Sequence, residues 1–358
     1  MLPIVGQLEG LVLHDFMCFA HAELRFLPGI NVFIGENGTG KTALLKLMYA
    51  SLRGLNQRTE VVRVAKADTE TATAARLMGV FKPDRLGRLV RRRQGRAASS
   101  VELSFLVHEP NGDDWVWRKE PASFSFSIGS QAVKRVTVAD AVEPLTAPAL
   151  FLPSREVLSI YPGFLSLYER HEIHFDETYR DLCEALGHPK LRGPRSAFVS
   201  GVFDALAERL GATVRLKDDR FYIAFPGQGE FEAALVSEGL RKLGVLMHLV
   251  LNGMLTDKYV LFWDEPESSL NPKYVAVLVE VLKILASEGV QVFLASHDYL
   301  LTQKLSLIAE SDDKTESQFF SLNAGDEGVT VEQASTLLDL KHNPIADEFE
   351  AHYSKLLQ

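Results

Sequence analysis

The stretch GENGTGKT, from Gly35 to Thr42, has the residue types needed to hold a phosphate chain. It fits the pattern G-x-x-x-x-G-K-[ST] without a mismatch. The glycines let backbone N–H groups turn inward, the lysine reaches the outer phosphates, and the last hydroxyl can bind Mg²⁺. We therefore expect this segment to bind ATP with Mg²⁺. The alternative is a glycine-rich turn that only connects a strand to a helix. The residues expected to contact the nucleotide are Gly35, Glu36, Asn37, Gly38, Thr39, Gly40, Lys41, Thr42 and Ala43.

The stretch VLFWDEPESSLNP, from Val260 to Pro272, is an apolar run that ends in three carboxylates. Neighbouring carboxylates repel one another and resist burial. They could lie in a solvated turn at a strand end, or they could face a metal-bound triphosphate. The phosphate loop in the same chain favours the second interpretation. We expect Asp264 to hold Mg²⁺ together with Thr42, and Glu265 to orient and polarise the attacking water.

A parallel sheet with helices is needed to bring these residues together. The order strand, turn, helix is expected around GENGTGKT, and two apolar strands flank a long helix after the carboxylates. This alternation is typical of β-α-β units with a buried parallel sheet. The alternating or apolar patterns predict strands at 8–13, 22–26, 30–34, 101–107, 115–117, 123–128, 259–263 and 290–295, a mostly helical segment at 162–210, a hairpin at 212–225, and helices up to 251 and at 273–287.

Together these motifs resemble the ATP-binding-cassette (ABC) type of ATPase, in the non-transporter branch that includes RecF-, SMC- and OLD-like proteins. FMCFAHAELRFLPGINVFIGENGTGKTALL looks like that branch's N-terminal hairpin and phosphate loop. VLFWDEPESSLNP looks like its metal-binding strand, catalytic glutamate and D-loop, and VFLASHDYLL is similar to its switch segment. The resemblance implies an α/β ABC-ATPase fold: a mostly parallel P-loop sheet flanked by helices, an N-terminal antiparallel β subdomain and a helical lobe.

The resemblance also implies how the chain is organised. Residues 1–358 would form a single ABC-type ATPase domain, with a basic insertion at 58–98. Residues 162–236 would form a helical lobe and hairpin that lead to a signature segment. No heptad array long enough for a coiled-coil arm is visible, which weakens the case for an SMC- or Rad50-like tether.

Sites in the ABC family are composite, because a signature segment from a second subunit closes over the γ-phosphate. The resemblance therefore implies a homodimer. The candidate signature is VSEGLRKLG, in which Ser237, Glu238 and Gly239 would contact the nucleotide at a helix start. Locally a simple N-cap explains this segment equally well, and its place between the two motifs favours the signature. His297 would contact the γ-phosphate, which completes a catalytic set with Lys41 and Glu265.

The sequence departs from the family pattern in two places. Glu238 stands where the signature usually has glycine, and Arg241 or Lys242 is expected to compensate its charge. The glutamine of the family's Q-loop is missing from FLPSREVLSIYPGF. The residues that could replace it are Ser154, Arg155 and Glu156, although PSR could equally be a plain turn before a helix. We also expect Phe16 to pack near the base.

The stretch RLMGVFKPDRLGRLVRRRQGR is crowded with positive charge. It carries Arg76, Lys82, Arg85, Arg88, Arg91, Arg92, Arg93 and Arg96 against one acid, Asp84. A contact with the phosphate backbone of DNA or RNA is one interpretation. A solvated insertion, or a docking face for an acidic partner, is the other. Phe81 is the only aromatic residue in the stretch, so base stacking is not expected.

Composition sets the remaining bounds. The net charge of −9 provides no global field for nucleic acid, so any such contact needs a local patch. Two cysteines, Cys18 and Cys183, provide no disulfide framework or metal cluster. No stretch is long and apolar enough to span a bilayer, and the first residues do not resemble a signal peptide. We expect a soluble cytoplasmic protein with no membrane partner.

These observations predict an ATP-binding and ATP-hydrolysing dimeric switch. Relatives of this kind often act beside a separate effector in genome maintenance or defence, which the resemblance suggests for this chain too. A non-enzymatic, ATP-gated interaction module is the alternative that Glu238 and the missing Q-loop glutamine keep open. A transporter's nucleotide-binding subunit fits less well, because the segment between Thr42 and Ser237 is long for that compact form.

Overall fold

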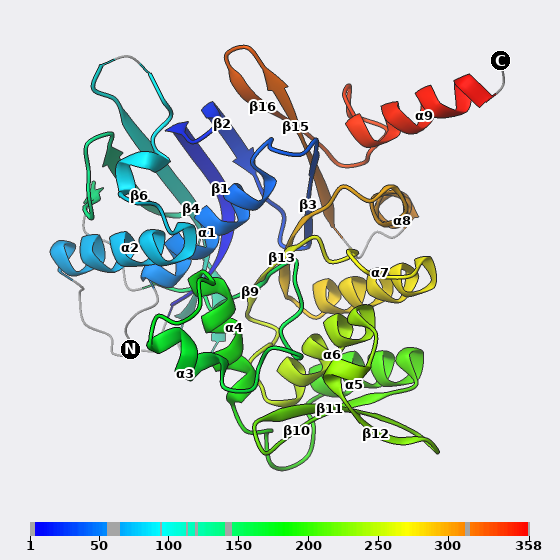
Figure 1. Cartoon of the computed structure of the whole chain (residues 1–358). Helices are drawn as coiled ribbons and strands as arrows, with labels where there is room; N and C mark the ends of the chain where they lie inside the picture. The colour runs from blue at the N-terminus through cyan, green and yellow to red at the C-terminus, as the bar shows by residue number, and fades with distance from the viewer. Residues whose placement is uncertain are drawn as a thin grey trace.

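A six-stranded sheet forms the centre of the protein (Figure 1). Two of its strands end at Gly35 and Asp264, where the phosphate loop and the group of carboxylates begin. The computed structural model describes residues 4–55, 65–93, 95–111, 114–118, 121–139, 145–311 and 316–356. The strand order is β16-β15-β3-β14-β13-β9, and only the β15–β16 pair is antiparallel. The strands are β3 (Ile30–Gly35), β9 (Ala149–Leu152), β13 (Val260–Asp264), β14 (Gln291–Ala295), β15 (Ser317–Gly325) and β16 (Gly328–Ala334). The predicted mostly parallel sheet is confirmed.

Both faces of this sheet are covered, which explains why its central strands read as continuous apolar runs. Ile30, Val32 and Ile34 point to one side, where helices α5 to α8 complete the core. Phe33 points to the other side, toward α1 and a second sheet. The helices are α1 (Lys41–Leu55), α5 (Ala197–Leu210), α6 (Glu238–Leu251), α7 (Pro272–Ser287) and α8 (Tyr299–Ser311).

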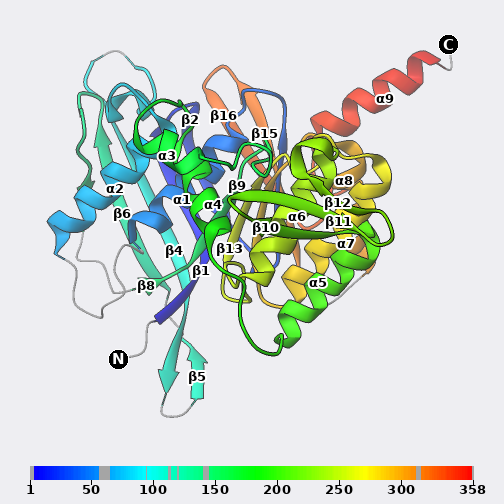
Figure 2. The same ribbon diagram turned by 60° about the horizontal axis from the view of Figure 1, so that its bottom comes forward.

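The second sheet is antiparallel apart from its β1–β8 pair, and it covers α1 and α2 (Figures 1 and 2). Its main path is β2-β1-β4-β6-β7, with β5 paired to β4 and β8 to β1. The predicted N-terminal hairpin is confirmed, and the structure extends its first strand to Phe16. The elements are β1 (Ile4–Phe16), β2 (Phe19–Arg25), α2 (Lys66–Phe81), the 3-10 helix η1 (Leu86–Leu89), β4 (Ala98–Asn111), β5 (Asp114–Trp117), β6 (Ala122–Gly129), β7 (Thr137–Val138) and β8 (Leu145–Thr146).

The chain between β9 and α6 forms a lobe of helices with a small sheet of its own. The predicted hairpin is β10 (Thr213–Lys217) with β11 (Arg220–Phe225). A third strand, β12 (Gly229–Glu232), was not predicted, because its short glycine-flanked sequence carries no alternation of buried residues. The helices are α3 (Phe164–Glu169), α4 (Glu177–Gly187) and α5, and the 3-10 helix η2 (Ala233–Leu235) leads to α6.

The segment after α8 contributes more structure than the sequence analysis predicted. Residues 312–315, in the expected acidic loop, lie outside the described residues. Beyond them β15 enters the central sheet beside β3, with β16 at the edge. Helix α9 (Pro344–Leu356) then projects from the body in both views (Figures 1 and 2).

The predicted basic stretch is largely folded. Residues 58–64 and 94 lie outside the described part, while α2 and η1 occupy most of the remainder. Arg76 contradicts the prediction of a nucleic-acid contact, because its side chain is only 14% exposed and its Nη1 lies 3.1 Å from both Glu177 and Asp181. Asp181 also accepts a hydrogen bond from the hydroxyl of Tyr49, at 2.6 Å. Arg76 therefore joins α2 to α4 and α1.

Other arginines of the stretch also have intramolecular contacts. Arg93 pairs with Asp15 at 2.7 Å, and Arg91 donates to the carbonyl of Glu327. Arg88 lies 4.0 Å from Asp84 in a weaker, exposed pair. The exposed positions at Arg85, Arg92 and Arg96 remain as candidate contacts for an anionic ligand.

Arg76→Met is predicted to lower the free energy of unfolding by about 3–5 kcal/mol, because it leaves the buried Asp181 and the partly buried Glu177 without their main counter-charge. Arg88→Met, which removes an exposed pair, should cost no more than about 1 kcal/mol. Urea unfolding followed by circular dichroism measures both. Equal effects of the two substitutions would contradict a structural role for Arg76.

Candidate active site

The loop between β3 and α1 has the shape needed to surround a phosphate chain. Gly40 has φ 93°, and a Cβ atom there would lie 2.7 Å from Cys18 Sγ, so only glycine fits. Lys41 Nζ donates to the carbonyls of Gly35 at 2.7 Å and Glu36 at 2.9 Å. Burial lowers the pKa of Lys41, and the nearby carboxylates Glu265 and Asp264 oppose that shift. The ammonium group thus lies inside the loop, within reach of a ligand.

Thr42 and Asp264 meet although they are far apart in the sequence. The Thr42 hydroxyl donates to both oxygens of Asp264, at 2.9 and 3.1 Å. Burial raises the pKa of Asp264, and the Thr42 hydrogen bond opposes the shift. Hydroxyl and carboxylate oxygens suit Mg²⁺, which usually takes its other ligands from phosphates and water. Thr42 and Asp264 offer two such oxygen ligands. Among the described residues no group of three His, Cys, Asp or Glu could hold a metal.

Glu265 and His297 lie next to each other beyond the ends of β13 and β14. His297 Nδ1 is 3.6 Å from Glu265 Oε1, and both side chains are partly exposed. Glu267 lies deeper: it accepts hydrogen bonds from the Ser296 hydroxyl at 2.8 Å and from the His297 N–H at 3.4 Å. Burial raises the pKa of Glu267. Glu265 and His297 are therefore partly exposed, whereas Glu267 is buried.

Lys41, Thr42 and Glu265 line an open cavity of about 440 Å³, whereas Asp264 and His297 are not among the residues that line it. Its walls include Met17 and Phe81, which the sequence analysis did not identify. The expectation that Phe16 packs near the base is wrong: Phe16 is fully buried and contacts Phe81 edge-on, with ring centroids 5.9 Å apart. Residues alternate sides along β1, so the turn after it exposes Met17 instead. The lining residues are Met17, Asn37, Gly38, Gly40, Lys41, Thr42, Ala43, Lys46, Phe81 and Glu265.

The predicted signature residues are absent from the lining of this cavity. Ser237 is exposed at the N-cap of α6, and its side chain makes no capping hydrogen bond. Gly239 is buried against the D-loop, where a Cβ atom would lie 2.8 Å from Leu270 and 2.9 Å from the Ser269 carbonyl. Glu238 is not paired with Arg241, which instead pairs with Glu156 at 2.8 Å. The hydroxyl of Ser237 is thus presented outward, away from this chain's phosphate loop.

Two of the three possible Q-loop substitutes have structural contacts. The side chain of Glu156 is 6% exposed and holds Arg241, and the Ser154 carbonyl accepts from Ser268 Oγ at 3.3 Å. Arg155 is exposed and lies near Tyr179. Burial, followed by Asp176, raises the pKa of Tyr179 to about 12, and Arg155 opposes that shift. The contact of Ser154 is made by its backbone, so Ser154 and Arg155 both remain candidates for the Q-loop role.

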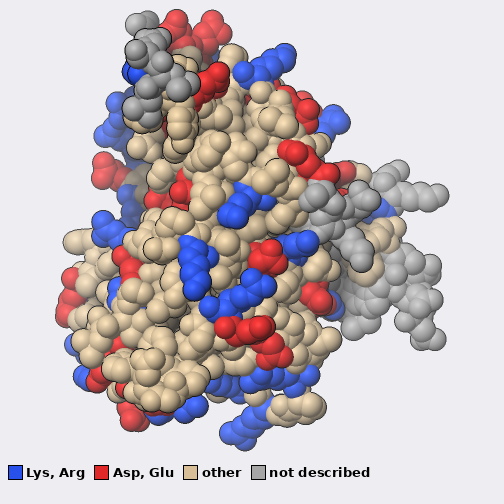
Figure 3. Space-filling model, turned by 90° about the vertical axis from the view of Figure 1, so that its right-hand side faces the viewer, with Lys and Arg blue, Asp and Glu red and all other residues tan. Residues whose placement is uncertain are grey.

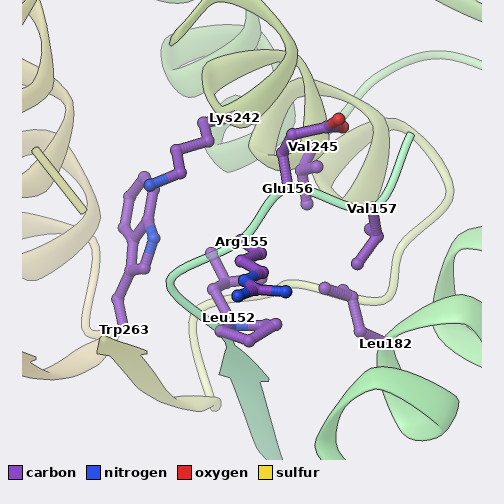
Figure 4. Close-up of a pocket in the computed structure, with 9 residues that line it drawn as sticks. Leu152, Arg155, Glu156, Val157, Leu182, Lys242, Val245 and Trp263 are labelled. Atoms are coloured by element: carbon purple, nitrogen blue, oxygen red, sulfur yellow. The ribbon is translucent and has the colours of Figure 1, made fainter. Parts of the chain in front are cut away.

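Figure 4 shows a small cavity, of about 10 Å³, beside this segment. Side chains from β9, β13, α4 and α6 meet there. Its volume suits about one water molecule, so it is a packing gap and not a ligand site. The residues that line it are Leu152, Pro153, Arg155, Glu156, Val157, Leu182, Lys242, Val245 and Trp263.

Comparison with known families agrees with this geometry. A family described as "AAA domain, putative AbiEii toxin, Type IV TA system" matches residues 82–302, more than half of the chain, and one described as "AAA domain" matches residues 11–105. The chain belongs to this AAA-domain family. It is an ABC-type ATPase of the RecF- and SMC-like branch, as the motifs predicted.

Relatives of this AAA-domain protein match it over short segments. Structural maintenance of chromosomes protein 6 of Dictyostelium discoideum is 33% identical over 121 residues, which are 31% of this chain and 10% of that protein. DNA replication and repair protein RecF of Psychromonas ingrahamii is 40% identical over 68 residues, 19% of each chain. The matches therefore span a fifth or less of these relatives.

Solved structures of SMC heads share the fold. An SMC head bound to the C-winged helix domain of ScpA has a TM-score of 0.56 at 13% identity, and the alignment covers 94% of this chain and 99% of that one. An SMC head with an extended coiled coil, bound to the C-terminal domain of ScpA derived from Pyrococcus furiosus, has a TM-score of 0.50 at 12% identity. The predicted ABC-ATPase fold is confirmed. In the described part of the chain, no helix is long and apolar enough to cross a membrane.

Phe81→Ala is predicted to raise the Kd and KM for ATP roughly tenfold and to leave kcat unchanged, because the lost apolar contact binds the base in ground and transition states alike. Equilibrium binding of a fluorescent ATP analogue and steady-state turnover measure the two quantities. Tyr353→Ala, in exposed α9, is the control. A fall in kcat at unchanged KM would contradict a role in base binding.

Proposed function

We propose that the chain is a single ABC-type domain that binds Mg-ATP and hydrolyses it to ADP and phosphate. The observation that carries this proposal is the 2.9 Å hydrogen bond from Thr42 to Asp264, beside a cavity that Thr42 lines together with Lys41 and Glu265. A cation at that pair, a phosphate chain in the loop and a water beside Glu265 would occupy adjacent positions. This arrangement is what in-line phosphoryl transfer requires.

Each residue has a distinct part in the proposed reaction. Lys41 and the loop N–H groups, at the positive end of α1, bind the outer phosphates. Thr42 and Asp264 hold Mg²⁺, which when bound neutralises charge on the phosphate oxygens. In this proposal Glu265 accepts a hydrogen bond from the attacking water and orients it, and His297, 3.6 Å from Glu265, contacts the γ-phosphate. Positioning and charge stabilisation carry most of the rate.

The proposal includes a homodimer with two composite sites. Ser237 is exposed, its hydroxyl makes no capping bond, and neither it nor Glu238 lines the cavity of its own chain. A second copy would bring Ser237 and the first N–H groups of α6 to the open side of that cavity. Hydrolysis would then release the contact between protomers, and the change in dimerisation would be the output.

A DNA-related role with a separate effector protein extends this proposal. The named relatives act in chromosome maintenance and DNA repair, and the SMC heads with this fold are bound to ScpA. The exposed arginines Arg85, Arg92 and Arg96 are the proposed contact with nucleic acid. On the face shown in Figure 3, positive and negative side chains are interspersed, with Lys and Arg more frequent along the lower edge.

Glu265→Gln is predicted to retain ATP binding, to lower turnover at least about 100-fold, and to accumulate as an ATP-bound dimer, since the neutral amide lacks the negative charge that polarises the attacking water. Turnover assays and size-exclusion chromatography with and without ATP measure these effects. Glu288→Gln, at the exposed end of α7, is the matched control. Unchanged turnover would refute the role of Glu265, and negligible turnover by the unaltered protein would favour the non-enzymatic module.

Duplex DNA at low salt is predicted to stimulate ATP turnover above the Glu265→Gln background. Replacing Arg85, Arg92 and Arg96 together with glutamine should weaken DNA binding and flatten its salt dependence by about one unit of slope per lost phosphate contact. Fluorescence anisotropy at several salt concentrations measures both.

The matched control for that experiment removes the same charge from the lobe, by replacing Arg192, Arg209 and Arg220, all of them exposed, with glutamine. A loss of DNA binding in this variant alone would show that the DNA contact lies on the lobe. ATP turnover that does not change when DNA is added would instead indicate that a protein is the regulating partner.

A further inference from the structure

Lys242 is a buried lysine in α6, with 3% of its surface exposed. Lysines are almost never buried to this extent unless they are paired. Its Nζ donates to the carbonyl of Ser268 at 3.0 Å, to the carbonyl of Glu265 at 3.3 Å, and to the Ser268 hydroxyl. All of these acceptors lie in one place, the turn of residues 265–268 that follows β13.

That turn has an unusual backbone at the residue whose orientation matters most. Glu265 has φ 47°, in the left-handed region that non-glycine residues adopt only when the surroundings hold them there. Its N–H donates to the Ala295 carbonyl at 2.9 Å, and its carbonyl accepts from Ser268 N at 3.1 Å as well as from Lys242. The backbone of Glu265 is therefore fixed on both sides, and Lys242 brings a charged donor to its carbonyl.

The charge of Lys242 is also suited to its position. Burial lowers its pKa, and Glu238, Glu267, Glu265 and Asp264 oppose that shift. Lys41 approaches the same carboxylates from α1, which packs on the opposite face of the parallel sheet from α6. Lys41 thus lines the nucleotide cavity, whereas Lys242 contacts the backbone of the turn that carries Glu265.

Helix α6 touches the same loop a second time, at its first turn. Gly239 packs so closely on Ser269 and Leu270 that a Cβ atom could not be added without movement. The helix start that carries Ser237 and the turn that carries Glu265 therefore make two independent contacts, one of packing and one of charged hydrogen bonds.

We propose that Lys242 is a positioning residue for hydrolysis: it holds the 265–268 turn so that Glu265 faces the attacking water of its own protomer's site. It does so from the helix whose first residues would serve the second protomer's site. This inference rests on the proposed function, because the turn matters only if Glu265 orients a water.

The first test compares Lys242→Met with the unaltered protein. Met keeps the aliphatic chain and removes the donors, so kcat should fall at least about tenfold while the Kd for ATP changes less than about twofold, since Lys242 does not line the nucleotide cavity. Lys134→Met, at an exposed lysine, is the control. A lower melting temperature with unchanged kcat and KM would overturn the proposal, because a purely structural role would act that way.

Ser268→Ala removes one acceptor and keeps the lysine, so it tests the proposal if Lys242→Met does not fold. It should lower kcat by about two- to fivefold at unchanged Kd for ATP; an unchanged kcat would overturn the proposal. The proposed function fails separately, when the unaltered protein shows no turnover or Glu265→Gln shows full turnover.

Mixed dimers distinguish action within a protomer from action across the interface. One protomer carries Glu265→Gln, so only its partner's phosphate loop and Glu265 form a live site. Lys242→Met in the partner should then abolish most of the remaining turnover, whereas Lys242→Met in the Glu265→Gln protomer, which supplies the signature, should leave it within about twofold. The reverse pattern would show that Lys242 positions the signature and would overturn the assignment to Glu265.

Discussion

The structure depends on keeping three acids together at the end of one buried strand. Asp264 ends β13, Glu265 and Glu267 follow it within three residues, and Asp264 and Glu267 are each more than nine-tenths buried. Like charges in a poorly solvated place repel and favour protonation. Two lysines, Lys41 and Lys242, offset this repulsion with positive charge. The hydroxyls of Thr42 and Ser296 donate hydrogen bonds to Asp264 and Glu267. The carboxylates can remain available to a metal and a water because these groups surround them.

This requirement explains the layering of the molecule. Lys41 and Thr42 are the first residues of α1, so the loop before α1 must end beside β13; β3 and β13 are separated only by β14. Lys242 must come from the other face, which places α6 under β13 and brings the start of α6 to the D-loop. The two faces of one parallel sheet thus supply opposite sides of one charge cluster, a consequence of β-α-β connectivity.

Much of this could be predicted from the sequence because the signals were local. The phosphate loop, the strand before Asp264 and the helix after it are each encoded within about fifteen residues, and all were predicted. The misses involved tertiary contacts. Arg76 looked like part of an exposed basic run. Its partners Glu177 and Asp181 lie about a hundred residues away in the sequence, so the pattern of local charge could not predict them. Phe81 lines the cavity only because α2 packs beside α1, and Phe16 was misplaced by one residue of strand alternation.

The lobe is connected to both halves of the site through different helices. Asp176 caps the start of α4 and pairs at 2.6 Å with Lys46, a residue of the nucleotide cavity. Asp181 of the same helix is held by Arg76 and Tyr49. Helix α6 reaches the 265–268 turn through Lys242.

Helices α4 and α6 also contact each other at their far ends. There His248 and Asn252 contact the carbonyls of Leu186 and Ala185 at 3.0 and 2.8 Å. Because burial lowers the pKa of His248 to about 4, its ring is neutral at physiological pH, so this joint carries no charge of its own. Contacts through the lobe, as well as the strands of the central sheet, therefore connect the phosphate loop to the 265–268 turn.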